Sequence, residues 1–209
     1  MRAVALVLAL LVPAPVTARP TTLPPIDQCS KDADFATFLG ELKRMTAARD
    51  RDAFLALLSD DVTVDFGGGG GREDFAKAWS FDPGEHGNVW DLLAKIIKMG
   101  CARVNEIRVI PSLIEQVDSD DEAVFDSRLV LPGAKLFREP GKSATASAVA
   151  PWAVVTVINT GGDLWTGVRL PDGLKGWISD DDLYEPLGYR MTIEKRAGKW
   201  AITAFVAGD

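Results

Sequence analysis

Apolar residues in the first third of the chain recur at the spacing of an amphipathic helix. Phe35, Phe38, Leu39, Leu42 and Met45 fall at i, i+3, i+4, i+7 and i+10. This spacing places all five side chains on one stripe of a helix. The pattern therefore predicts a helix that begins close to Phe35 and buries one face.

Further helices follow from the same periodicity. Asp32 or Asp34 stands where its side chain can cap the first helix. Apolar pairs and turn residues predict three more helices, over 52–58, 72–79 and 88–99.

Alternating apolar and polar residues predict strands elsewhere. The strands are expected over 62–66, 103–110 and 123–130, and a final hairpin is expected from the runs 189–194 and 199–205. Two strands alone are marginally stable in water, so this hairpin must join a larger sheet.

The stretch 134–186 looks like a complete small domain. Its strand-forming runs are Leu136–Arg138, Trp152–Ile158, Leu164–Leu170 and Leu174–Ile178. They are separated by turn sequences such as Gly161-Gly162-Asp163 and Pro171-Asp172-Gly173, in which glycine supplies positive φ. The alternation of short strands and tight turns predicts a compact β-barrel.

Three motifs in this stretch resemble those of bacterial SH3-like domains of extracytoplasmic proteins. They are Leu136-Phe137-Arg138-Glu139-Pro140, Gly162-Asp163-Leu164-Trp165 and Gly176-Trp177-Ile178. The resemblance implies an SH3-like β-barrel that serves as a binding or spacing module.

The remainder is similar to the cone-shaped α+β family named after nuclear transport factor 2. The similarity rests on the order of elements and on the final hairpin, Glu194-Lys195-Arg196-x-Gly198-Lys199-Trp200-x-Ile202. It implies that the barrel is inserted before a hairpin that returns to the first sheet. The alternative is two domains in series, with the hairpin extending the barrel.

The predicted fold class is therefore α+β, with an N-terminal α+β domain, a small SH3-like β-barrel and a C-terminal β-hairpin. The expected segments are a signal peptide (1–18), an extended leader (19–33), the α+β domain (34–133), the barrel (134–187) and the hairpin (188–209).

The N-terminus has the pattern of a secretory signal peptide. Arg2 precedes the apolar run 3–12, and Val16-Thr17-Ala18 offers small residues for cleavage. Later apolar runs are shorter than the ~20 residues that a spanning helix needs. We expect a periplasmic or secreted protein with no membrane span after cleavage.

Charge and cysteine content narrow the function classes. The chain has a formal net charge of −7, which argues against nucleic acid as a partner because few cations are available to release counterions. An oxidising compartment favours a disulfide between Cys29 and Cys101, the only cysteines in the sequence. Two buried thiols, or a cysteine nucleophile served by His86, are the alternatives.

No catalytic constellation emerges. His86 is the only histidine in the sequence, and neither a Ser-His-Asp pattern nor a metal-ligand spacing accompanies it. The glycine run 67–71 lacks the Lys-Ser/Thr of a phosphate-binding loop. The sequence predicts a protein that is not an enzyme and has no cofactor and no metal.

Aromatic residues of the barrel are the best binding candidates, because aromatic grooves hold extended peptides. We expect Trp152 and Tyr184 on the surface and Trp177 in the core, while Asp180, Asp181 and Asp182 form an acidic rim that favours a cationic ligand.

The predicted function is recognition of a peptide, a cell-wall fragment or an envelope protein by the barrel. A small-molecule carrier or enzyme with a cavity in the α+β domain, and a structural partner in an envelope complex, remain alternatives.

Overall fold

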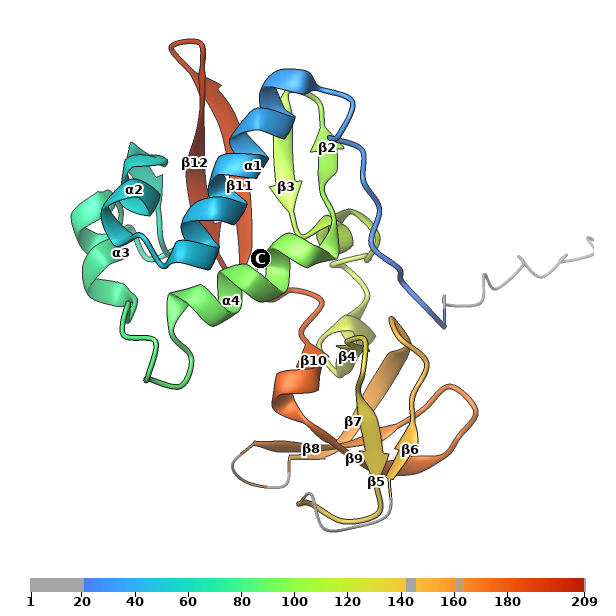
Figure 1. Ribbon diagram of the computed structural model, residues 1–209. Coiled ribbons are helices and arrows are strands. Elements are labelled where there is room, and N and C mark those ends of the chain that lie inside the picture. The colour runs from blue at the N-terminus through green and yellow to red at the C-terminus, as the bar shows by residue number, and fades with distance from the viewer. Residues whose placement is uncertain (1–20, 142–145, 161, 163, 209) are drawn as a thin grey trace, which may run out of the picture.

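The protein has an α+β fold with two sheets (Figure 1). The computed structural model describes residues 21–141, 146–160, 162 and 164–208, so the predicted signal peptide (1–18) and two residues of the predicted turn Gly161-Gly162-Asp163 lie outside the described part.

The first body is a five-stranded sheet with helices on one face. Its strands run in the order β1-β12-β11-β3-β2, and α1 and α4 cross that face in Figure 1. The helices are α1 (Ala33–Ala48), α2 (Arg51–Ala56), α3 (Arg72–Ala78) and α4 (Val89–Ile96), and the strands are β1 (Leu58–Thr63), β2 (Ala102–Val104), β3 (Ile107–Ile110), β11 (Arg190–Arg196) and β12 (Lys199–Val206).

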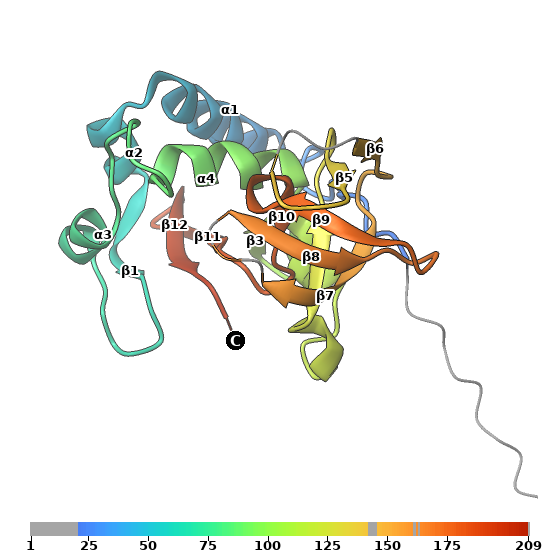
Figure 2. The same cartoon turned by 90° about the horizontal axis from the view of Figure 1, so that it is seen from below.

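The second body is a seven-stranded sheet in the order β10-β4-β7-β8-β9-β5-β6. Figure 2 shows it from below, with β7, β8 and β9 side by side. Its strands are β4 (Ser127–Val130), β5 (Lys135–Phe137), β6 (Ala146–Ala148), β7 (Val154–Thr160), β8 (Trp165–Arg169), β9 (Lys175–Ser179) and β10 (Leu183–Tyr184). The 3-10 turns in the described ranges are η1 (Ile97–Met99), η2 (Ser112–Glu115), η3 (Glu122–Val124) and η4 (Asp180–Asp182).

The C-terminal hairpin returns to the first sheet, as predicted. β11 pairs antiparallel with β3, and β12 pairs in parallel with β1. The second sheet is therefore inserted in sequence between β3 and β11, and the alternative in which the hairpin extends the barrel is wrong.

Three predicted strands differ from those observed. The first is β1, at Leu58–Thr63 rather than 62–66. The run 103–110 is divided into β2 and β3 because Asn105 adopts a positive φ of 53°. The run 123–130 begins as the turn η3 and continues as β4, which pairs with β7 and so belongs to the second sheet.

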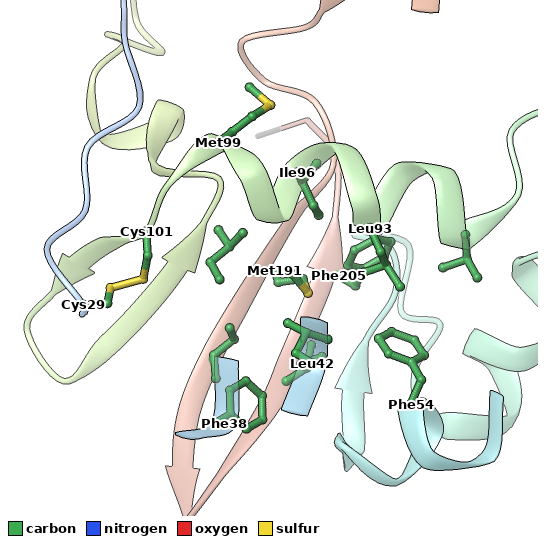
Figure 3. Close-up of a cluster of buried hydrophobic side chains, with 14 of the residues drawn as sticks. Cys29, Phe38, Leu42, Phe54, Leu93, Ile96, Met99, Cys101, Met191 and Phe205 are labelled. Carbon is green, nitrogen blue, oxygen red and sulfur yellow. A yellow bond between two sulfur atoms is a disulfide. The ribbon is translucent and has the colours of Figure 1, made fainter. Parts of the chain in front are cut away.

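Helix caps and core residues explain how the first body forms. The Asp32 side chain accepts a hydrogen bond from the backbone N–H of Phe35, so Asp32 caps α1. The apolar faces of α1 and α4 meet the hairpin in one core. Figure 3 shows Leu42, Leu93 and Phe205 in that core, each with no solvent exposure.

The leader connects the two bodies. Leu23 N–H donates to the carbonyl of Trp152, beside the second sheet, and Gln28 N–H donates to the carbonyl of Cys101, next to β2. Cys29 and Cys101 form the predicted disulfide at one end of the core (Figure 3).

Replacing both cysteines with alanine should lower the free energy of unfolding by about 4 kcal/mol, because the disulfide restricts a long loop of the unfolded chain. The two cysteines are separated by 72 residues. Urea unfolding of the variant and of the oxidised chain measures the difference, and chemical reduction of the native chain should produce a similar loss. Equal stability of both forms would contradict this account.

Deleting residues 188–209 should unfold the first body, because the deletion removes two of the three inner strands of its sheet, β12 and β11. Hydrogen exchange should show lost protection in α4 and retained protection in β7 and β8. Full protection of α4 in the truncated chain would show that the first body is stable without the hairpin.

Candidate functional site

A groove on the second body combines aromatic and acidic side chains. Its volume is about 630 Å³, and it lies between the β5–β6 hairpin, β8 and η4. The residues that line it are Gly133, Lys135, Phe137, Ala146, Ala148, Trp165, Ser179, Asp181 and Asp182.

The pairing of β5 with β6 brings together the residues of one wall of this groove. Lys135 lies opposite Ala148, and Phe137 lies opposite Ala146. Cross-strand partners share a face of the sheet, and Leu136, between the two β5 residues, points into the core with 6% exposure. The alanines leave space beside the larger side chains, which makes this wall concave.

An aromatic pair forms another wall. The rings of Phe137 and Trp165 pack edge to face, with centroids 5.2 Å apart and an interplanar angle of 86°. Trp165 lies opposite Ser179 on β9, which also lines the groove. Both aromatic side chains are half-buried, so each retains surface that a ligand can contact.

The three consecutive aspartates have different surroundings. Asp180 accepts a hydrogen bond from the Thr166 hydroxyl at 2.6 Å and lines a neighbouring hollow. Asp181 and Asp182 line the groove, and Asp181 Oδ1 is 3.9 Å from His86 Nε2 on the first body. Among the lining residues that the structure describes, Lys135 is the one cation, beside the two carboxylates of Asp181 and Asp182.

The structure does not place the predicted aromatic residues in this groove. Tyr184 is only 6% exposed and belongs to the core of the first body; its hydroxyl donates to the carbonyl of Tyr189, and burial raises its pKa. Trp152 is half-buried against the same core. The prediction that Tyr184 offers a surface for binding is wrong, because β10 and the chain after it bring its ring between the two bodies.

Trp177 also differs from its predicted place. It is half-buried, whereas its neighbour Ile178 is fully buried in the core of the second sheet. Successive side chains of a strand point to opposite faces, so Ile178 excludes Trp177 from that core. The same alternation at Leu136 and Phe137 is the signal in the sequence that points to Phe137 as a groove residue.

Most N–H groups of the glycine run are already hydrogen-bonded within the chain and so are not free to hold a phosphate. The Asp65 carboxylate accepts from the N–H groups of Gly67 and Gly69, and Asp74 accepts from Gly70. These bonds hold the loop before α3 in a local turn.

The described part of the chain contains neither a metal-binding cluster nor a membrane-spanning helix. Its His, Cys, Asp and Glu side chains form no group of three that could hold a metal ion. None of the helices within the described ranges has the length and apolar character needed to cross a bilayer.

Comparisons with known proteins provide little further information. No protein-family model and no curated protein matches the chain. A solved structure named as a variant of Rd1NTF2_05 is 14% identical and covers 85% of this chain and 99% of its own, with a TM-score of 0.30. This likeness is too low to place the chain in a family.

Proposed function

We propose that this protein is an exported binding protein whose second body recognises an extended peptide or cell-wall fragment that carries a free amine. The observation that carries the proposal is the groove in which the Phe137–Trp165 pair lies beside Asp181 and Asp182. The disulfide Cys29–Cys101 supports export, because such bonds persist in oxidising compartments.

Aromatic contact would supply most of the affinity. A cation or an apolar segment gains from contact with an aromatic face, and a cation–π contact is worth about 0.5–2 kcal/mol. Exposed ion pairs contribute about 0–1 kcal/mol. Asp181, whose side chain is 78% exposed, would therefore act mainly by attracting and orienting the amine.

An edge strand adds a means of holding an extended ligand. In the described part of the sheet, β6 pairs with β5 alone and forms one edge. Ala146 and Ala148 of this strand also line the groove. A peptide that pairs with the edge would direct alternate side chains toward the aromatic pair.

The proposal predicts the effect of removing each aromatic ring. Trp165→Ala and Phe137→Ala should each weaken binding about tenfold, since each removes a ligand contact of about 1–2 kcal/mol. Calorimetric titration with a synthetic wall tetrapeptide that contains a diamino acid measures the change. The Leu174→Ala variant, which alters an exposed residue outside the groove, should bind like the parent chain.

Changes in salt concentration and in ligand charge distinguish the contribution of the aspartates to binding from that of the aromatic pair. The double variant Asp181→Asn, Asp182→Asn should bind more weakly at low salt and lose most of the salt dependence, whereas Asp52→Asn, which changes a 93% exposed side chain on α2, should not. Acetylating the side-chain amine of the tetrapeptide should have the same effect as the double variant. An intact protein that fails to bind the free tetrapeptide, or whose binding is unchanged by Trp165→Ala, would overturn the proposal.

A further inference from the structure

A second hollow lies in the first body, where α1 begins beside β3, β11 and β12. It has a volume of about 310 Å³, at the lower end of the ~300–1,000 Å³ typical of ligand pockets. Asp32, Arg108, Lys195 and Trp200 line it. None of the described residues that line this hollow also lines the groove of the second body.

Strand register directs Arg108 toward α1. Arg108 lies opposite Ile193, whose side chain is fully buried in the core, and the whole Arg108 residue is only 3% exposed. Its guanidinium donates to Asp32 Oδ2 at 2.9 Å and to the carbonyl of Ile107. The Arg108 Cζ atom lies 5.0 Å from the centroid of the Trp200 ring.

Two donors in this hollow have no acceptor. Arg108 Nε and Trp200 Nε1 are both buried, and neither finds a hydrogen-bond partner within the described ranges. Buried donors of native proteins are nearly always paired, because an unpaired donor loses its hydration without replacement. Both unpaired donors belong to side chains that line this hollow, and the Arg108 guanidinium lies over the Trp200 ring. A ligand that offers an acceptor atom would replace the hydration that these donors have lost.

The charges around the two donors indicate whether the acceptor is an anion or a neutral group. Arg108 is paired with Asp32, and Lys195 Nζ is 3.1 Å from Asp34 Oδ2. Glu106, at the rim, has a 94% exposed side chain. Each of these two cations therefore already has a carboxylate partner, so an added anion would gain little. It would also approach the carboxylates of Asp32, Glu106 and Glu194, which line the hollow.

We propose that this hollow binds a small neutral molecule through a carbonyl or amide oxygen. The oxygen accepts hydrogen bonds from Arg108 Nε–H and Trp200 Nε1–H, and the rest of the molecule lies against Trp200. The site is independent of the groove on the second body, so its failure would leave the proposed function untouched.

Nuclear magnetic resonance of the full chain tests the proposal with 2-pyrrolidinone, a neutral cyclic amide, as the probe. The indole N–H signal of Trp200 should shift saturably, with a dissociation constant of about 1–10 mM for so small a ligand. Acetate at the same concentration should shift it much less. A Trp200 signal that does not move with 2-pyrrolidinone, or that responds more strongly to acetate, would overturn the assignment.

Trp200→Phe keeps an aromatic ring and removes the donor, so it should weaken binding of 2-pyrrolidinone about tenfold. Saturation-transfer titration, observed on the probe, measures the dissociation constant in this variant, which has no Trp200 indole N–H signal. Trp165→Phe makes the same change in the groove and should leave the constant unaltered. Unchanged affinity in a folded Trp200→Phe protein would also contradict the proposal, and the shift experiment on the parent chain decides the question if that variant does not fold.

Discussion

The pairing of β11 with β3 and of β12 with β1 is the interaction on which the rest of the structure depends. These two strands come from the last 20 residues of the chain, yet they occupy inner positions of the first sheet. They supply Met191, Ile193, Ile202 and Phe205 to the core, all with no exposure. The helices α1 and α4 have no complete surface to pack on until this pairing forms.

Insertion of the second body follows from the same pairing. The chain leaves the first sheet after β3 and returns at β11, so the second body is joined to the first at both ends. The ion pair between the Arg128 guanidinium and the Glu185 carboxylate, 2.9 Å apart, joins two segments of the inserted part. The groove lies on the inserted sheet, whereas the hollow lies at the start of α1, where Trp200 packs against the core of the first body.

Local features of the fold could be predicted from the sequence, whereas features that depend on distant partners could not. The helix stripe from Phe35 and the cap by Asp32 involve neighbours within one or two turns, so periodicity finds them. The return of the final hairpin to a larger sheet is predictable because two strands alone are marginally stable in water. The membership of β4 in the second sheet depends on pairing with β7, which no local pattern records.

The candidate sites show the same division. The acidic character of η4 is visible in the sequence, and two of its aspartates line the groove. Alternation about the buried Leu136 points to Phe137 as a groove residue, whereas the burial of Tyr184 depends on contact between the two bodies, which no local pattern records. Burial of Arg108 depends on Asp32, which lies 76 residues away in the chain.

The leader segment has a consequence for how the sequence can vary. Most of its attachments are main-chain hydrogen bonds: Leu23 to Trp152, Thr21 to Val154 and Gln28 to Cys101. Every residue supplies a backbone carbonyl, and every residue except proline also supplies a backbone N–H. Between the buried Leu23 and Cys29, related chains can therefore differ in most leader side chains and still hold the two bodies together in the same way.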